Sequence, residues 1–300
     1  MRALLLLLAA CTPFSNDGTD WTPLAEITGE LATEQGPDPA PLDVPCTLHV
    51  VTFNVHFADD VPNLAAQIQA SQFVSQADVI VIQEIRRYTN EPESRAQHLA
   101  ELLGMTWIYA PAHTVDGGGV HGLAILSKFP LANAEMKQLP YMDYPEFPEQ
   151  RIALRADLVL GPSSEIDVAK IIDVHLDTRL PPSDRIRQLD PALYDAPERT
   201  IIGGDFNTLP WTWVSGAVPL ISSEAVTDEQ SAKIVDGYFA DNGFARSVEY
   251  DAVTARAPVF DIRLDNVYAR TFTRLGGDVE HVDGSDHWPV WFDVATGICL

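Results

Sequence analysis

The feature that most limits how this chain can fold is a series of short apolar runs, each followed closely by a polar or charged side chain. The clearest is 200–202, a run of β-forming residues that leads through Gly203 and Gly204 to Asp205 and Asn207. A buried strand that ends in this way presents polar side chains at a surface, and glycine lets the backbone turn there without steric cost. Gly, Asp and Asn are also the common residues of ordinary turns, so this run alone does not separate a turn from a functional site.

The apolar pattern along the chain predicts many strands and few helices. We expect strands at 48–55, 79–82, 106–109, 122–127, 132–139, 151–160, 168–176, 200–202, 263–268 and 288–294, and helices at 61–75, 95–103 and 183–195. Residues 132–139 are expected to return as a hairpin partner of 122–127, and residues 111–119, with three consecutive glycines, to form a loop. Since strands outnumber helices and many are neighbours, the pattern favours two packed sheets with helices outside.

The charge of the chain limits its partners. The 300 residues have a formal net charge of −24 at pH 7, and 46% of them are hydrophobic, which is ordinary for a globular protein with a sizeable core. Such an acidic protein repels phosphate backbones, and the sequence has no basic stripe of the kind that binds duplex nucleic acid. The charge favours a soluble protein outside the cytoplasm.

The first residues resemble the signal of a bacterial lipoprotein. Met1 and Arg2 precede the apolar run 3–10 and Cys11, which is a charged region, a short hydrophobic region and a small-residue cleavage site. We expect residues 1–10 to be a signal peptide and Cys11 to become the lipidated first residue, which would anchor the protein in the bacterial cell envelope. A plain secretory peptide and a cytoplasmic protein with an apolar start are the alternatives.

Residues 11–45 are expected to be an acidic tether between this anchor and a folded domain at 46–300. Residues 12–45 contain seven Asp or Glu, six Pro and no Lys or Arg, so like charges repel and no hydrophobic period survives. Cys46 and Cys299 lie near the two ends of the domain, and an even pair in an oxidising compartment suits a disulfide. Two free thiols are the alternative, because the sequence does not give the distance between them.

Several predicted strands have a residue with acid–base or metal-binding chemistry at or near one end. Singly, each has an ordinary interpretation, because a carboxylate can cap a turn and a lone histidine is more often a satisfied core residue. Since so many occur in one chain, we interpret them as one site. They are Asn54, Glu84, His175, Asp205 with Asn207, Asp265, and Asp286 with His287.

The motifs around these residues resemble those of the endonuclease/exonuclease/phosphatase superfamily, and they occur in the same order along the chain, over residues 48–295. The resemblance implies an α+β fold, a four-layer α/β/β/α sandwich of two mixed β-sheets flanked by helices. It also implies an enzyme that cleaves phosphoester bonds with the help of a divalent metal ion. The matching segments are Thr52–Val55, Gln83–Glu84, Gly122–Ser127, Asp173–Asp177, Gly203–Asn207 and Gly284–His287.

The resemblance assigns the metal to Glu84 and Asp286, with Asn54 nearby. A phosphodiester repels nucleophiles, so a divalent cation is needed to neutralise its oxygens and polarise the phosphorus. Mg²⁺ is the expected cofactor, with Mn²⁺ or Ca²⁺ as alternatives. Hard cations take oxygen ligands, and the sequence offers no Cys-rich or His-rich site of the kind typical of zinc.

The same resemblance assigns the catalytic residues. Asp205, oriented with Asn207, would direct and deprotonate the attacking water, while His175 and His287 would stabilise the charge of the transition state. Asp265 matches the residue that holds such a histidine protonated and correctly turned, here His287.

Four further residues are assigned less narrowly. A residue that contacts phosphate is expected between the second and third motifs, and both Tyr109 and His121 lie there, so the choice stays open. Arg151 is expected either to reach the phosphate or to serve a structural purpose. His56, two residues after the first motif's asparagine, is expected to cap the strand rather than to line the pocket.

Neither the fold nor the catalytic set selects the substrate. Charge and envelope anchoring favour a phosphodiesterase or phosphatase acting on lipid headgroups, nucleotides or other small phosphoesters. A secreted nuclease acting on DNA or RNA is the alternative, and it would need a local positive groove. A third alternative is a surface lipoprotein that keeps the fold for binding but has lost turnover. We expect a monomer attached to the membrane by its lipid anchor.

Overall fold

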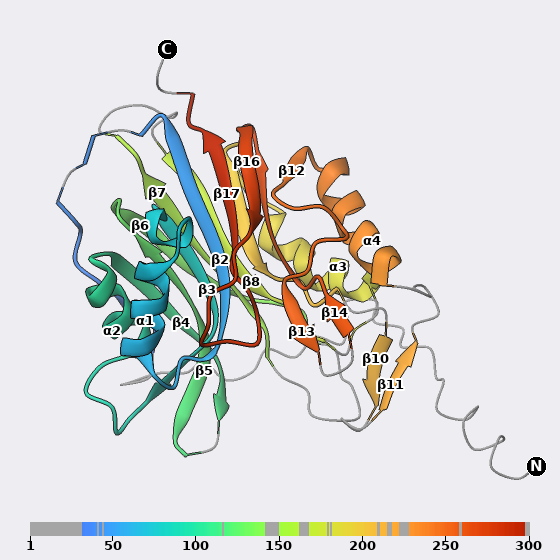
Figure 1. Cartoon of the computed structure of the whole chain (residues 1–300), viewed down its shortest axis with the longest axis horizontal. Helices are drawn as coiled ribbons and strands as arrows, with labels where there is room; N and C mark the ends of the chain where they lie inside the picture. The colour runs from blue at the N-terminus through green and yellow to red at the C-terminus, as the bar shows by residue number, and fades with distance from the viewer. Residues whose placement is uncertain are drawn as a thin grey trace, which may run out of the picture.

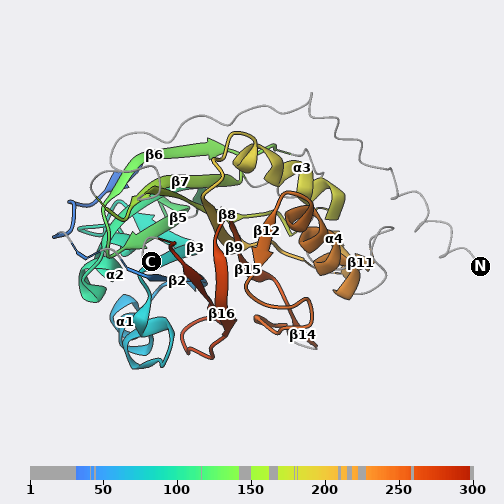
Figure 2. The same ribbon diagram turned by 90° about the horizontal axis from the view of Figure 1, so that it is seen from above.

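The computed structural model describes residues 32–40, 42–43, 45–115, 117–141, 150–161, 168–178, 180, 182–208, 211–214, 218–221, 228–257 and 260–297. Two β-sheets pack face to face, and helices cover the outer face of each (Figure 1). Seen from above, α1 and α2 lie on one side of the sheets and α3 and α4 on the other (Figure 2). The predicted four-layer sandwich of two mixed sheets flanked by helices is confirmed.

The larger sheet has seven strands in the order β1-β4-β5-β3-β2-β17-β16. β2 and β3 run parallel, and the other neighbouring pairs are antiparallel. The carboxyl ends of β2 and β3 therefore lie together at one edge of the sheet. The strands are β1 Glu34–Gln35, β2 Thr47–Phe57, β3 Val79–Tyr88, β4 Thr106–Val115, β5 Gly119–Ser127, β16 Thr273–Val279 and β17 Val290–Ala295.

The smaller sheet has six strands in the order β12-β15-β9-β8-β7-β6. Its central pair, β8 and β9, is parallel, and the other neighbours are antiparallel. Two short hairpins, β10 with β11 and β13 with β14, lie outside both sheets. The strands are β6 Leu131–Gln138, β7 Ile152–Val159, β8 Val168–His175, β9 Thr200–Asp205, β10 Trp211–Val214, β11 Val218–Ile221, β12 Phe244–Arg246, β13 Ala255–Ala257, β14 Phe260–Ile262 and β15 Asp265–Arg270.

The helices begin and end where capping residues occur. α2 (Arg95–Leu103) starts after Ser94, whose hydroxyl accepts the backbone N–H of Gln97 at 3.1 Å. It ends at Gly104, which has a φ of 69° and forms a left-handed cap. α1 (Val61–Ala70) stops before its predicted end at residue 75, where the chain continues as a short 3₁₀ turn. On the other side, α3 is Pro182–Leu193 and α4 is Asp228–Asp241.

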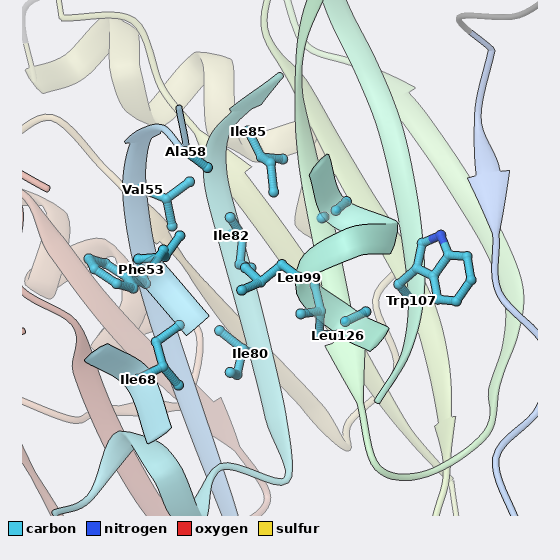
Figure 3. Packing of buried hydrophobic residues seen from close by; sticks show 14 of the residues in the cluster. Phe53, Val55, Ala58, Ile68, Ile80, Ile82, Ile85, Leu99, Trp107 and Leu126 are labelled. Carbon is cyan, nitrogen blue, oxygen red and sulfur yellow. The ribbon is translucent and has the colours of Figure 1, made fainter. Parts of the chain in front are cut away.

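Three apolar cores hold the layers together. Figure 3 shows part of the outer core of the larger sheet, where Phe53 of β2 and Ile80 and Ile82 of β3 pack with Ile68 of α1 and Leu99 of α2. Each such side chain contributes about 1.5–3 kcal/mol when it is fully buried. The core between the sheets is built from the alternate faces of the same strands, and it includes Val50, Val79, Val81, Ile125, Leu154, Ile171 and Ile201.

Gly203 and Gly204 lie within β9, so the predicted turn at these glycines is wrong. A Cβ on Gly203 would lie 2.7 Å from Val81 Cγ2 in the facing sheet, and one on Gly204 would collide with the carbonyl oxygen of Val174 in β8. Glycine is required because side chains of the facing sheet approach Gly203 and the backbone of β8 approaches Gly204, and the strand continues to Asp205.

The predicted hairpin between 122–127 and 132–139 is also wrong. β5 belongs to the larger sheet, whereas β6 belongs to the smaller one and pairs with β7. The chain therefore crosses between sheets at residues 128–130, which a local pattern does not reveal. The predicted loop at 111–119 is mostly strand, because β4 continues to Val115 and β5 begins at Gly119.

Part of the predicted tether packs on the domain. Glu34 and Gln35 form β1 on the edge of β4, and the Glu34 carboxylate lies 3.3 Å from Nε of Arg87. Cys46 is disulfide-bonded. Its predicted partner Cys299, the predicted lipidation site Cys11 and the signal residues 1–10 lie outside the described residues, so those assignments stay predictions. In the described part of the chain, every helix is too short or too polar to cross a bilayer.

Candidate active site

The polar strand ends from both sheets meet at one place. In the larger sheet, the parallel pair β2 and β3 ends near Asn54 and Glu84, and in the smaller sheet the parallel pair β8 and β9 ends at His175 and Asp205. His175 and Asp205 are register partners. Because parallel strands expose their carboxyl ends at the same edge, stacking the two sheets brings the four side chains together.

Asn54 links the two sheets through its side-chain amide. Its Nδ2 donates to Glu84 Oε1 at 3.1 Å and to Asp205 Oδ2 at 3.0 Å, while its Oδ1 accepts the backbone N–H of His56 at 3.1 Å. Two carboxylate oxygens at one end of the amide and an N–H at the other define its orientation. Asn54 therefore holds the two carboxylates together. Its side-chain oxygen, the atom that would ligate a metal if Asn54 were a ligand, already accepts the backbone N–H of His56.

Asp205 is a buried carboxylate with an unusual pKa. Burial raises the pKa, the charge of Asp265 raises it further, and His287 partly offsets both, so that the value is about 6. Asp205 Oδ1 accepts the backbone N–H of Asn207 at 2.9 Å, and Asn207 in turn donates its Nδ2 to the carbonyl oxygen of Leu176 at 2.8 Å. A carboxylate with a pKa near 6 is ionised at neutral pH and basic enough to accept a proton.

His287 and Asp265 form a buried pair opposite Asp205. His287 Nδ1 lies 2.8 Å from Asp265 Oδ2, and its Nε2 lies 3.9 Å from Asp205 Oδ2. Burial alone would lower the pKa of His287, but the charge and hydrogen bond of Asp265, followed by the charges of Asp205 and Asp286, raise it to about 10. His287 is therefore a cation at neutral pH.

Thr254 holds this pair in place, and no sequence motif pointed to it. Its hydroxyl donates to Asp265 Oδ2 at 2.8 Å and accepts the backbone N–H groups of Leu264 at 2.9 Å and Asp265 at 3.0 Å. Its carbonyl oxygen accepts the N–H of Trp288 at 2.6 Å. One fully buried threonine thus connects the start of β15 with the segment that carries His287.

A group of basic side chains lies beside Asp205 and Glu84. His175 Nε2 is 3.5 Å from Asp205 Oδ2 and 4.0 Å from Glu84 Oε1. A small pocket next to it is lined by His113, His121 and Arg151. Burial lowers the pKa of His175 well below its ordinary value, and the charge of Arg151 and the neighbouring histidines lower it further, so the imidazole is neutral.

The structure separates the two residues that the sequence left open. His121 lines this pocket, with its ring 6.4 Å from that of His175 between centroids. Tyr109 lies on the opposite face of the sheet, in the core under α1 and α2, and its hydroxyl donates to the carbonyl oxygen of Val120 at 3.4 Å. Arg151 is in the pocket with His121, whereas Tyr109 is a core residue.

Asp286 lies at the open side of the site. Its side chain is 55% exposed, compared with 2% for Asp205. Ser285 fixes this segment on the end of β2, because its hydroxyl donates to the carbonyl oxygen of Asn54 at 2.7 Å and accepts the backbone N–H of His287 at 3.1 Å. His56 was expected to cap the strand, but it lies in the site, with Nδ1 3.3 Å from Asp286 Oδ1.

Five non-glycine residues of the site have positive φ. His56, Phe57 and Ala58 have φ of 41°, 77° and 51°, Glu84 has 62°, and Asn207 has 48°. Each such conformation costs about 1–3 kcal/mol and persists only where the surrounding structure enforces it. Register shifts interrupt β2 between Asn54 and Phe57 and β3 between Ile82 and Ile85. The backbone is therefore irregular where it delivers the polar side chains.

Among the residues that the structure describes, two groups of side chains are candidates to hold a divalent cation. The first is Asp205, Asp265 and His287, whose ligand atoms lie within 4.8 Å of one another. It fits poorly, because Asp265 is bonded to His287 and a protonated imidazole cannot ligate a metal. The second is Glu84 with Asp286. Burial raises the pKa of Glu84 and the charge of Asp205 adds to this, although the hydrogen bond from Asn54 and the charges of His287 and Arg151 oppose it, so a bound cation would stabilise a carboxylate whose ionised form burial disfavours.

The chain belongs to the Endonuclease/Exonuclease/phosphatase family, whose sequence profile matches residues 51–287. Enzymes of this family are generally phosphoester hydrolases that depend on a divalent metal. A search of curated proteins found no match.

Solved structures with a similar fold include an endonuclease/exonuclease/phosphatase from Beutenbergia cavernae, at 23% identity and a TM-score of 0.63, with 84% of this chain and 72% of that chain covered. Another is D. rerio TDP2 complexed with a single strand DNA product, at 16% identity and a TM-score of 0.55, with 83% and 99% covered. A third is the catalytic domain of human Nocturnin with a bound sulfate anion, at 17% identity and a TM-score of 0.53, with 85% and 95% covered. At these identities the likeness shows the fold.

Proposed function

We propose that this protein is a divalent-metal-dependent hydrolase of phosphoester bonds. The observation that carries the proposal is the pairing of Asp205 with His287, two buried groups whose pKa values are shifted to about 6 and about 10. At a pH between these two values, Asp205 is an ionised carboxylate that can accept a proton and His287 is a cation. A site that keeps a base and a cationic donor 3.9 Å apart suits attack of water on an anionic phosphorus centre.

In this proposal Asp205 accepts the proton of the attacking water. Asn54 and the backbone N–H of Asn207 hold its two oxygens, so the carboxylate faces the site in one orientation. His287 donates from Nε2 to a phosphoryl oxygen, since its Nδ1 is bound by Asp265. His175, as a neutral imidazole, donates from Nε2 to the phosphoryl group from the side opposite His287. Removing one such donor typically lowers the rate by about 10²–10³.

Glu84 and Asp286 are proposed to hold the cation, with Mg²⁺ as the first candidate and Mn²⁺ or Ca²⁺ as alternatives. When bound, such an ion would neutralise the phosphoryl oxygens and make the phosphorus more electrophilic. The pocket lined by His121 and Arg151 would receive a further oxygen of the substrate. Asn54, assigned to the metal by the resemblance, is proposed instead to hold Glu84 and Asp205 together.

The substrates that we favour are lipid headgroups, nucleotides and other small phosphoesters. The net charge of −24 opposes long nucleic acids, whose binding requires neutralising many phosphates. Nucleic acid is the second candidate, because the similar D. rerio TDP2 structure holds a single strand DNA product. An inactive binding protein is disfavoured, since each position of the catalytic set is occupied by a competent residue.

Turnover of three substrates tests this proposal. Purified protein with Mg²⁺ or Mn²⁺ would be assayed against an aryl phosphodiester, sphingomyelin and plasmid DNA. We expect cleavage of the small diester, loss with a chelator, and a fall of about 10²–10³ in kcat for Asp205→Ala and for His287→Ala. Absence of turnover on all three, with folded and metal-loaded protein, would instead support the binding role.

We further propose that Cys11 is lipidated and holds the protein in the bacterial cell envelope, with residues after it as the tether. The support is the signal-like sequence before Cys11. Cys11→Ser should move the protein from the membrane to the soluble fraction. Unchanged partitioning in a detergent extraction would contradict the lipid anchor and leave the enzymatic proposal unaffected.

A further inference from the structure

His56 lies between the two carboxylates proposed to hold the cation. Its Nδ1 is 3.3 Å from Asp286 Oδ1 and 3.9 Å from Glu84 Oε2. Two ligand atoms of one six-coordinate ion lie about 3 Å apart when adjacent and about 4.2 Å apart when opposite, for bonds near 2.1 Å. Both separations fall in this range. The nitrogen is therefore spaced from each oxygen, taken singly, as two ligands of one ion can be.

We infer that His56 is itself a ligand of the cation, through Nδ1, and that the site consequently prefers Mn²⁺ to Mg²⁺. The inference rests on the proposed function, because it takes Glu84 and Asp286 as the carboxylates of the metal site. An imidazole is a good ligand for transition metals and a poor one for Mg²⁺, which takes oxygen ligands. One nitrogen among oxygens is thus enough to change the preference.

The third ligand position is open to His56 because Asn54 does not fill it. The Asn54 oxygen accepts the backbone N–H of His56, and its nitrogen faces Glu84 and Asp205. The same hydrogen bond to the His56 N–H places the imidazole next to Asp286. Asn54 thereby positions a ligand that stands two residues further along the chain.

The backbone and the neighbouring rings hold His56 in this direction. His56, Phe57 and Ala58 all have positive φ, so the end of β2 curls instead of continuing as a regular strand. The His56 ring lies 4.4 Å from the Phe57 ring between centroids, and the guanidinium of Arg86 lies 3.5 Å from the centre of the Phe57 ring. The half-exposed imidazole remains accessible to an ion from solvent.

The other histidines of the site are already used. His287 Nδ1 is bonded to Asp265, and its Nε2 faces Asp205. His175 Nε2 lies nearer to Asp205, at 3.5 Å, than to Glu84, at 4.0 Å. His56 is the imidazole that contacts both Glu84 and Asp286.

Electron spin-echo spectroscopy of bound Mn²⁺ tests the inference directly, because a coordinated imidazole produces ¹⁴N modulation. Mn²⁺ would be added below one equivalent to the full-length protein, so that the tightest site is observed. We expect ¹⁴N modulation in the wild type and none in His56→Asp, which supplies an oxygen ligand and still binds the ion. His98→Ala, which removes a partly exposed histidine of α2 that lies near Glu93, should keep the modulation.

Calorimetry supplies the second readout. We expect His56→Asp to reduce the preference for Mn²⁺ over Mg²⁺ by about tenfold, mainly by weakening Mn²⁺. His56→Asn should do the same if aspartate perturbs folding, and circular dichroism would verify the fold of both variants.

The outcomes separate this inference from the proposed function. Bound Mn²⁺ without ¹⁴N modulation in the wild type, or modulation that persists in His56→Asp, would overturn the role of His56 while the metal site stands. His56 would then be only an ion-pair partner of Glu84 and Asp286. Failure of the wild type to bind Mn²⁺ more tightly than Glu84→Gln would overturn the proposed metal site and, with it, the inference.

Discussion

Replacing Thr254 with valine tests whether one hydroxyl organises the catalytic side of the site. Valine has nearly the same shape as threonine, so the substitution removes the hydroxyl without opening a cavity. Thr254→Ser is the matched control, because it keeps the hydroxyl and removes only a methyl group. Thr254 is fully buried, and water therefore cannot replace the lost partner without a rearrangement.

The expected loss of stability follows from the hydrogen bonds of this hydroxyl. In Thr254→Val the backbone N–H groups of Leu264 and Asp265 lose their acceptor, and an unpaired buried donor costs about 1–3 kcal/mol. Asp265 Oδ2 also loses a donor but keeps His287. We expect a loss of about 3 kcal/mol in the free energy of unfolding, against about 1 kcal/mol for the methyl removed in Thr254→Ser.

Activity should fall for a separate reason. Without the hydroxyl, Asp265 is free to rotate, so His287 is held less firmly. We expect kcat to fall about tenfold in Thr254→Val, which corresponds to about 1.4 kcal/mol of transition-state stabilisation, with little change in KM. Thr254→Ser should stay near the wild-type kcat.

Urea unfolding followed by circular dichroism measures the first effect, and turnover of an aryl phosphodiester measures the second. If the valine variant unfolds within about 1 kcal/mol of the serine variant, the hydroxyl does not satisfy the two N–H groups as we argue. If both variants keep wild-type kcat, Thr254 does not position Asp265 and His287.

Three further predictions concern the metal, the sheets and a buried acid. Saturating Mn²⁺ should stabilise the wild type by about 2.7 kcal/mol at a hundredfold excess over Kd, and Glu84→Gln should abolish this, as calorimetry would show. Gly203→Ala should cost about 1–3 kcal/mol in denaturant, because its Cβ would meet Val81 at 2.7 Å. Burial raises the pKa of Asp173 well above its ordinary value, despite the hydrogen bond from Gln83. In the folded protein Asp173 therefore stays protonated at pH values where it ionises in the unfolded chain. The free energy of unfolding should fall by about 1.4 kcal/mol for each pH unit above roughly pH 4, until the pH passes the folded pKa of Asp173. Asp173→Asn should remove this slope from the pH–stability curve.

Each of these has a clear contrary result. Equal stabilisation of Glu84→Gln by Mn²⁺ would place the ion elsewhere. A Gly203→Ala protein as stable as the wild type would mean that the sheets separate easily at this point. An Asp173→Asn curve parallel to the wild-type curve would mean that the acid ionises in the folded protein.

Much of the fold could be predicted from local patterns. The apolar runs located the core strands, and α2 spans the residues 95–103 that were expected to be helical. The errors occurred where distant contacts decide. β5 and β6 are neighbours in sequence but lie in different sheets, because each strand pairs with the partner that buries its apolar face. Gly203 resembles a turn residue, and its need for glycine comes from Val81 in the facing sheet.

The sequence could also predict most residues of the site, because their types and order match the family motifs. It could not predict Thr254, whose role depends on hydrogen bonds to Asp265 and to the chain around it. Nor could it choose between Tyr109 and His121, since the answer depends on which face of the sheet each side chain occupies. The structure places Tyr109 under the helices and His121 beside His175.

By itself, the sequence determined which chemical groups stand near the strand ends and that the strands form two sheets with helices outside. The tertiary structure decided which of those groups share a face, because regular alternation fails where they stand. β2 and β3 shift register beside Asn54 and Glu84, and β4 shifts against β5 between Pro111 and His113. One irregular residue reverses the side on which later side chains emerge. The same irregularity carries His56 from an expected strand cap to a position between two carboxylates.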